Sequence, residues 1–303
     1  ISNEGGGHAF VLDGYDGSDY FHVNWGWEGY QDSFFLLSSL NGYTDDQDAI
    51  IGIEGKNEHV DHQYPYAIYD NGTLTFYCDN KDADKTGTKV SVMKSKSSSW
   101  VGYSNSVITK VVFDPSFCAY QNIYDLSQWF YNCTNLAAIE GLEYLNTEKV
   151  ADMSSLFNGC SSLTSLDLST FNTQNVTNMS SMFSGCWRLK LLSLGNFNTQ
   201  KVKNMNSMFN GCSSLTNIDM SNFNTQKVSN MGNMFNGCSS IPVIDISKFN
   251  TRNVTDMSSM FANCRELNVI YAGNYWNTSN VAQGENMFSG CIKLNGERGT
   301  VYD

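Results

Sequence analysis

Several features that would place a protein in a common functional class are missing from this sequence. No run of about 18 apolar residues occurs, so the sequence contains no candidate membrane-spanning helix. Lys and Arg total 18 against 30 Asp and Glu, and the basic residues form no stripe, which argues against a nucleic-acid partner. The chain opens at Ile1 without a signal-peptide pattern and ends soon after a repeat, so we expect a fragment at both ends.

Cysteine is absent before Cys78, although the whole chain holds nine. Seven of the nine recur at one phase, which are Cys133, Cys160, Cys186, Cys212, Cys238, Cys264 and Cys291. Stacked turns would bring neighbouring Cα atoms within the disulfide range of about 4.4–6.8 Å, but side chains of one ladder point the same way. We therefore expect reduced, buried thiols. Paired Cys or His spacings are also absent, so we expect neither a metal site nor a cofactor.

The most regular feature present is a repeat of 26 residues, with spacings of 27 at its two ends. Self-similarity at a fixed period in this range predicts a solenoid or a propeller. A unit of this size cannot bury its own apolar face, so neighbouring units must stack into one continuous core.

One unit, residues 163–171, has the spacing LxxLxLxxF. Its alternation predicts a short strand with Leu166 and Leu168 inward. Ser165 and Asp167 then point outward. The other apolar positions expected in the core are Phe171, Val176, Met179, Met182 and Phe183. The fold class expected is therefore mainly β, a solenoid with one short parallel strand per 26-residue repeat and turns about 4.8 Å apart.

The units read approximately NVTNMSxMFxGCxxLxxLDLSxFNT over residues 126–294. This pattern resembles the leucine-rich-repeat surface proteins of the BspA type. The resemblance implies an extracellular or cell-surface location and a protein or cell-surface ligand.

The outward strand face is the expected binding surface of the repeats. One ladder on it consists of Asp167, Ser193, Asp219, Asp245 and Tyr271, and the other of Ser165, Leu191, Asn217, Val243 and Val269. Exposed apolar side chains at Leu191, Val243, Val269 and Tyr271 would form a contact patch. The alternative is structural: Asp219 and Asp245 would serve local turn hydrogen bonds, and the apolar residues would be half covered.

Residues 1–55 lack the repeat and are strongly acidic, since residues 1–62 hold twelve Asp and Glu against one Lys. We expect strands at residues 8–12, 20–25, 33–37 and 49–53, as part of a larger sheet, with an Asp-Gly turn over residues 13–18. The three carboxylates near this turn are Asp13, Asp16 and Asp19. They fit turn chemistry better than a calcium site.

The segments GGHAFVLDG, HVNWGWEG and FFLLSSLN resemble the end of the papain-like cysteine peptidases of the streptopain family. The resemblance implies that His8 is the catalytic base and that Asn24, sixteen positions later, orients its imidazole. It also implies that Trp25 covers this pair. A thiolate nucleophile needs an adjacent imidazole, which in turn needs an orienting acceptor.

The sequence departs from this family because no Cys precedes His8. Cys78 follows the His, and we interpret it as structural. His22 fits an ordinary strand residue. Two functions stay open: a fragment of a secreted cysteine endopeptidase with a binding repeat domain, inactive without its nucleophile, or a non-catalytic adhesin-like protein with a peptidase remnant.

The domain boundaries expected are a peptidase-like segment at 1–55, a linker at 56–63 that holds His59 and His62, an N-terminal cap at 64–126, and the solenoid at 127–303. The cap begins with a predicted hairpin around Asn71-Gly72, a pair that favours a type I′ turn. Strands are expected at residues 90–93, around Trp100, and at 108–113, the last as the first strand of the solenoid sheet.

Overall fold

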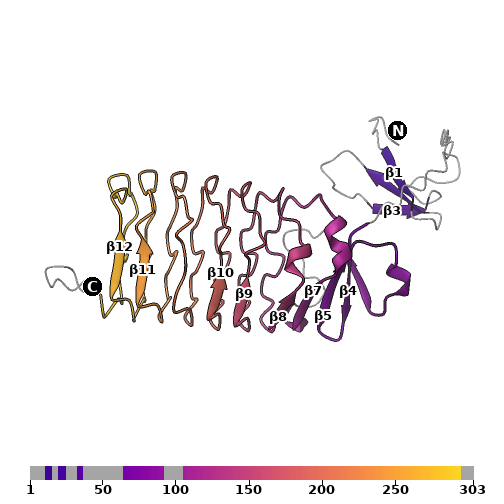
Figure 1. The fold of residues 1–303 in the computed structure, drawn as a ribbon, viewed down its shortest axis with the longest axis horizontal. Coiled ribbons are helices and arrows are strands. Elements are labelled where there is room, and N and C mark those ends of the chain that lie inside the picture. Colours follow the sequence, from indigo (N-terminus) through magenta and orange to yellow (C-terminus); the bar gives the residue numbers. More distant parts are fainter. Residues whose placement is uncertain (1–10, 16–19, 25–32, 37–63, 92–104, 295–303) are drawn as a thin grey trace, which may run out of the picture. The chain divides into compact units, whose positions relative to one another are not determined.

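A computed structural model of the chain describes residues 11–15, 20–24, 33–36, 64–91 and 105–294. The chain divides into two compact units, residues 1–62 and residues 63–303. The solenoid coils of the second unit stand side by side in chain order (Figure 1).

The first unit contains a three-stranded antiparallel sheet in the order β1-β2-β3. Its strands are β1 (Val11–Tyr15), β2 (Tyr20–Asn24) and β3 (Ser33–Leu36). Strand β1 runs three residues into the expected turn, with a register shift between Leu12 and Gly14. Such a bulge lets a strand bend and continue through Asp-Gly. The strand expected at residues 49–53, and Asp16 and Asp19, lie outside the described residues.

The second unit opens with a five-stranded sheet in the order β6-β4-β5-β7-β8. Its strands are β4 (Tyr66–Asp70), β5 (Thr73–Tyr77), β6 (Thr88–Ser91), β7 (Lys110–Phe113) and β8 (Ala138–Glu140). Asn71 and Gly72 have φ of 44° and 86°, as a type I′ turn requires. Strand β5 runs parallel to β7, so the parallel stack begins one strand earlier than the sequence predicted. Val92, Met93 and Trp100 lie outside the described residues.

Short 3-10 helices lie between these strands and directly after β8. They are η2 (Asp82–Asp84), η3 (Asn105–Val107), η4 (Pro115–Ala119) and η5 (Leu142–Tyr144). Asp114 caps η4, because its carboxylate accepts the Ser116 N–H at 2.9 Å.

The repeats form a mainly β solenoid, as expected. The strands that follow β8 are β9 (Ser165–Asp167), β10 (Leu191–Ser193), β11 (Val243–Ile246) and β12 (Val269–Ala272). Strand β9 pairs in parallel with β10, and β11 with β12. Residues 217–219, where a strand was expected around Ile218, are not part of one.

Pro242 explains why residues 217–219 do not pair with β11, which begins at the next residue. In neighbouring coils the equivalent amide donates to the previous coil, as Lys190 N does to Thr164 O and Asn268 N to Pro242 O, each at 2.8 Å. Proline has no N–H, so it cannot donate to Thr216. The column of strands β8 to β12 is called the strand column below.

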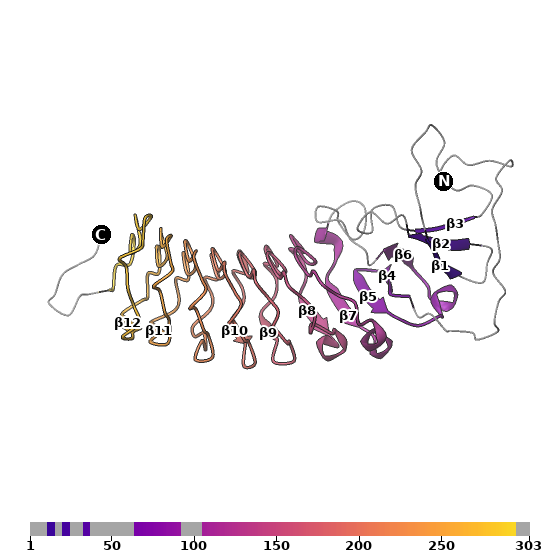
Figure 2. The same ribbon diagram turned by 90° about the horizontal axis from the view of Figure 1, so that it is seen from above.

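A second parallel column runs along the solenoid without interruption, and the sequence did not predict it. Isolated bridges join Asp125, Asp152, Asn178, Asn204, Asn230, Asp256 and Gln283 in succession. Backbone bonds continue past each bridge, as Ser181 N donates to Asn206 O at 2.8 Å and Phe183 N to Met208 O at 2.9 Å. Figure 2 shows the coils from above. We call this the bridge column.

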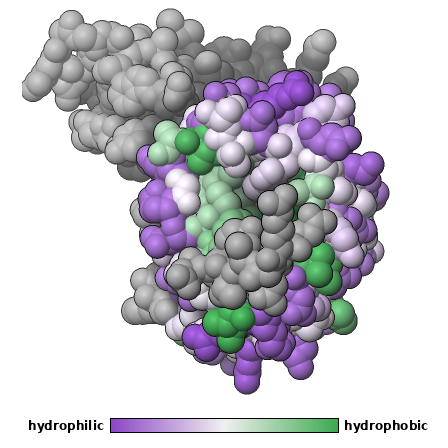
Figure 3. Space-filling model, turned by 90° about the vertical axis from the view of Figure 1, so that its left-hand side faces the viewer, coloured by the Kyte–Doolittle hydropathy of each residue, from purple (hydrophilic) through white to green (hydrophobic). Residues whose placement is uncertain are grey.

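A column of phenylalanine rings fills the centre of the solenoid. It consists of Phe130, Phe157, Phe183, Phe209, Phe235, Phe261 and Phe288, whose successive ring centroids are 5.6–5.9 Å apart. The seven inward residues predicted for the unit that begins at Leu163 are all buried, which confirms the interpretation of the repeat. In the last unit the equivalent positions are less covered, since Ala272 is exposed and Met287 and Phe288 are partly buried. At the end beyond β12, apolar surface lies inside a polar rim (Figure 3).

Buried threonines join each coil to the next. They are Thr147, Thr173, Thr199, Thr225 and Thr251. The hydroxyl of Thr199, for example, accepts the Asn224 N–H at 2.8 Å and donates to the Asn224 carbonyl at 2.9 Å. One side chain thus satisfies two backbone groups of the following coil, which explains why Asn-Thr recurs in every unit.

Candidate functional site

The peptidase-like residues lie at the edge of the described structure. Asn24 ends β2 and pairs with Val11 of the antiparallel neighbour β1. His8 stands three positions before Val11 in the sequence. His8 and Trp25 themselves lie outside the described residues, so their contact with Asn24 stays a prediction.

Cys78 does not have the properties of a nucleophile. It is buried, and burial raises the pKa of its thiol to about 11, with the Asp79 carboxylate adding to the shift. Catalytic thiols have pKa values below the ordinary range because a cation or a helix N-terminus stabilises the thiolate. Its backbone N–H donates to Ser116 Oγ at 3.1 Å, as expected for a structural residue.

The repeat cysteines are buried as the sequence predicted. From Cys160 to Cys264, each Sγ donates to a Phe carbonyl of the preceding coil at 3.1 Å. Burial raises the pKa of Cys186 and of Cys238 to about 12. These thiols are therefore protonated donors of the core. That they are reduced in solution stays a prediction.

The predicted outward face of the strand column is exposed in the structure. Leu191 is 71% exposed and Tyr271 is 57% exposed, whereas Val243 and Val269 are closer to half covered. Ser193 pairs with Asp167, Val243 with Val269, and Asp245 with Tyr271. The two ladders therefore exist within each strand pair, although the break at 217–219 separates one pair from the other.

The aspartates of this face also cap turns. Asp167, Asp219 and Asp245 accept the N–H of the serine two residues later at 2.8–3.0 Å. The Ser169 and Ser221 amides lower the pKa of Asp167 and Asp219. For Asp245 the Ser247 hydroxyl contributes most to the lowered pKa. Each carboxylate thus has a local role, and it remains charged and exposed.

Sequence reasoning missed Trp187, which is 58% exposed and lies four residues before Leu191. The signal was its departure from the Ser found at this position in three other units, Ser161, Ser213 and Ser239. The same coil, residues 179–204, holds four Lys and Arg and no Asp or Glu, in a chain of net charge −12. Exposed Trp beside Arg188 is typical of residues that dominate protein interfaces.

The described part of the chain contains no cluster of three or more His, Cys, Asp or Glu able to hold a metal ion. Within the same residues, no helix is long and apolar enough to cross a membrane.

The repeats match a family model described as Mycoplasma protein of unknown function, DUF285, over residues 113–191 and 182–300. These matches span more than half of the chain. The chain belongs to this family.

The N-terminal segment matches the Peptidase C10 family over residues 1–35. Streptopain of Streptococcus pyogenes is 47% identical over 60 residues, which cover 16% of this chain and 15% of streptopain. The thiol protease/hemagglutinin PrtT of Porphyromonas gingivalis is 38% identical over 82 residues, which cover 23% of this chain and 9% of PrtT. The chain thus spans less than a sixth of the length of these relatives. It combines a C10-like segment with leucine-rich-type repeats.

Two solved structures are similar to most of the chain. A leucine-rich cell surface protein from Faecalibacterium prausnitzii is 16% identical with a TM-score of 0.25, covering 78% of this chain and 81% of that one. A leucine-rich repeat protein from Bacteroides ovatus is 16% identical with a TM-score of 0.24, covering 78% and 80%. These TM-scores are low, so the solenoid assignment rests on the strand register of this chain.

Proposed function

We propose that this chain is a fragment of a secreted or surface cysteine endopeptidase whose repeats bind a protein or cell-surface ligand. The observation that carries the proposal is the match to streptopain, 47% identical over 60 residues, together with the C10 match over residues 1–35. The C10 match includes His8, Asn24 and Trp25. The antiparallel pairing of β1 with β2 supports it, since a hairpin of this kind can bring His8 and Asn24 together.

In this proposal His8 removes the proton from a cysteine thiol supplied by a part of the protein outside these 303 residues. The thiolate attacks the peptide carbonyl, and the imidazolium then donates its proton to the leaving amine. Asn24 accepts a hydrogen bond from the other ring nitrogen and holds one tautomer without adding charge. Trp25 excludes water from that bond.

The repeat domain would hold the enzyme at its target. Its outward face offers Leu191 and Tyr271 as exposed apolar contacts, beside the charged Asp167, Asp219 and Asp245. Ser193, Val243 and Val269 complete the surface. Exposed apolar residues on a charged rigid face are typical of protein-binding surfaces.

The test compares this chain with the longer product of the same coding sequence, using unfolded casein as substrate. The longer product should cleave casein only in the presence of a thiol reductant and lose activity on His8→Ala. Asn24→Ala should lower kcat and leave KM nearly unchanged, because Asn24 acts on the reaction through the imidazole of His8. The 303-residue chain should show no turnover. Strong thiol-dependent cleavage by the chain alone contradicts the assignment.

A non-catalytic adhesin-like protein is the second candidate. The observation that favours it is that the repeat family model matches residues 113–191 and 182–300, whereas the C10 match covers residues 1–35. A longer product that contains no cysteine upstream of His8, or that never cleaves casein, would decide for this alternative.

A further inference from the structure

Five basic side chains gather along one edge of the solenoid. This edge is formed by the stretch of each coil between the strand column and the bridge column, which covers residues 169–177, 195–203, 221–229, 247–255 and 273–282. These stretches contain no Asp or Glu, although the chain has a net charge of −12. Their basic residues, which are all exposed, are Lys201, Lys203, Lys227, Lys248 and Arg252. We call these five residues the cationic edge.

Stacking of the coils brings these residues together, although the sequence itself shows no basic stripe. Lys203 N donates to the Thr177 carbonyl at 2.8 Å, and Ser229 N donates to the Lys203 carbonyl at 2.9 Å, so equivalent positions of successive coils are neighbours. Coils of a parallel stack advance by about 4.8 Å, so the three coils that carry the five cations span about 10 Å. One extended ligand can therefore contact several of them.

The fold does not require these charges. At the positions equivalent to Lys201 and Lys203, the preceding coil has Asn175 and Thr177. Among the residues that the structure describes, none of the five cations forms an ion pair. Lys201 Nζ donates instead to the neutral Asn175 Oδ1, at 2.7 Å. Like charges this close repel one another, so an anionic partner would stabilise the edge.

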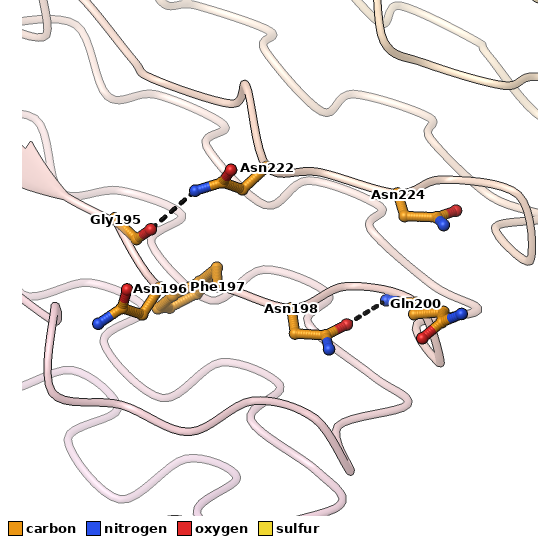
Figure 4. A pocket seen from close by; sticks show the side chains of 7 residues that line it. All are labelled: Gly195, Asn196, Phe197, Asn198, Gln200, Asn222 and Asn224. Atoms are coloured by element: carbon orange, nitrogen blue, oxygen red, sulfur yellow. Dashed lines mark hydrogen bonds between the residues drawn. The ribbon is translucent and has the colours of Figure 1, made fainter.

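Neutral polar groups lie between the cations. One hollow on this edge, of about 470 Å³, is bordered by the amide side chains of Asn196, Asn198, Gln200, Asn222 and Asn224 (Figure 4). A second hollow, of about 270 Å³, has Lys248 and Tyr275 in its lining. The Arg252 guanidinium carbon lies 5.6 Å from the centroid of the Tyr275 ring. The edge thus offers cations, amide hydrogen-bonding groups and one aromatic ring.

This composition argues against three classes of anionic partner. Folded proteins bind through aromatic and apolar residues at the centre of an interface, but Tyr275 is the one large apolar side chain exposed among the described residues of this edge. Single-stranded nucleic acids stack successive bases on several aromatic rings, which one tyrosine cannot provide. Binding to a lipid surface draws on apolar side chains that enter the membrane, and the edge does not offer a set of them.

An acidic polysaccharide fits the edge better. Its carboxylate or sulfate groups can pair with the ammonium and guanidinium groups. Its hydroxyls both donate and accept hydrogen bonds, as the amide side chains do. The apolar face of a sugar ring can pack on the ring of Tyr275.

We propose that the cationic edge binds an acidic polysaccharide. The proposal deepens the proposed function, because it names a class of cell-surface ligand for the repeats. It depends neither on the outward strand face nor on the peptidase-like segment.

The test measures binding of fluorescein-labelled heparin and polygalacturonate to the full chain by fluorescence anisotropy. At least one of them should bind, and its affinity should fall as the NaCl concentration rises, because salt screens exposed charges. Neutral dextran should not bind. The triple variant Lys201→Gln, Lys203→Gln, Lys227→Gln should weaken binding about ten-fold or more, because three exposed ion pairs with the ligand are lost.

The matched control is the triple variant Arg188→Gln, Lys190→Gln, Arg265→Gln. It removes the same net charge from exposed positions outside the cationic edge. This variant should keep nearly the affinity of the original chain, and both variants should keep its circular dichroism spectrum. The comparison separates a site from a general effect of charge.

Three results would overturn the proposal: no binding of either polysaccharide, an equal loss of affinity in the two triple variants, or equal binding of dextran. Tighter binding of polyglutamate, oligo(dT) or phosphatidylglycerol vesicles at these residues would also overturn it, because the ligand would then belong to another class. Cleavage of casein by the longer product is measured separately, so a failure of this proposal is distinguishable from a failure of the peptidase assignment.

Discussion

The strand column and the bridge column follow the same coils, yet they differ in regularity. The strand column is interrupted between β8 and β9 and again at residues 217–219, and its outward side chains change from coil to coil. The bridge column runs from Asp125 to Gln283 without a break. Buried threonine hydroxyls, such as that of Thr199, also join successive coils.

The difference shows where sequence variation is tolerated. Side chains between the coils satisfy backbone groups of the next coil, so a change there leaves buried polar groups without partners. On the outward strand face, the side chains of Leu191 and Tyr271 are exposed and do not pack into the core. The strand face can therefore vary for binding while the threonine ladder keeps the coils in register.

The largest effect should come from breaking the core that both columns share. Phe209 is fully buried, and its ring stacks 5.6 Å from Phe183 and 5.7 Å from Phe235. Phe209→Ala should lower the free energy of unfolding by about 3–5 kcal/mol, because it removes buried surface and leaves a cavity. Urea denaturation followed by circular dichroism measures the loss. Leu191→Ala is the control, with a change below about 0.5 kcal/mol. A loss at Phe209 as small as that of the control would mean that the ring column does not hold the coils together.

The threonine ladder should be the next most sensitive. Thr199→Val keeps the shape of the side chain but leaves the Asn224 N–H and carbonyl without their partner. The free energy of unfolding should fall by about 1–3 kcal/mol. Thr278→Val, at the exposed position of the last unit, is the matched control and should be nearly neutral. Equal effects of the two substitutions would show that the ladder does not stabilise the coil contacts.

The inward half of each repeat could be predicted from the sequence, and the bridge column could not. Alternation at Leu166 and Leu168 indicates a strand directly, since period two is visible in the residues. The bridge column has one paired residue per coil, such as Asn204, so it produces no period within a unit. The turn bonds of the recurring Asn, such as the one from the Gln200 N–H to Asn198 Oδ1, are likewise not displayed by the sequence. The peptidase-like residues were found only through resemblance.

The buried thiols should make stability depend on pH. Burial raises the pKa of Cys186 and Cys238 to about 12, whereas an unfolded thiol has a pKa of about 8.5. Above that value the unfolded state releases protons that the folded state retains, so stability falls as pH rises between about 8.5 and 12. Between about pH 7.5 and 9.5, each such thiol should contribute about 1.4 kcal/mol to the fall.

Cys186→Ala should remove that share of the pH dependence, whatever it does to stability at neutral pH. Cys118→Ala, at an exposed position, is the control and should leave the pH dependence unchanged. Thiol titration after denaturation without reductant should count close to nine groups. Disulfide bridges between adjacent repeats, found by mass mapping, would contradict both expectations.

The smallest effect concerns the interruption of the strand column. Pro242→Thr supplies an N–H where the neighbouring coils donate to the preceding one, so it should form a bond to the Thr216 carbonyl. That bond should contribute about 1 kcal/mol. Losing the restraint of proline on the unfolded chain should cost about 0.4–1 kcal/mol, so the net change in stability should be near zero. Amide hydrogen exchange followed by NMR should nevertheless show a protected N–H at residue 242. A clear loss of stability without that protection would mean that Pro242 is needed for its ring, and that the interruption has another cause.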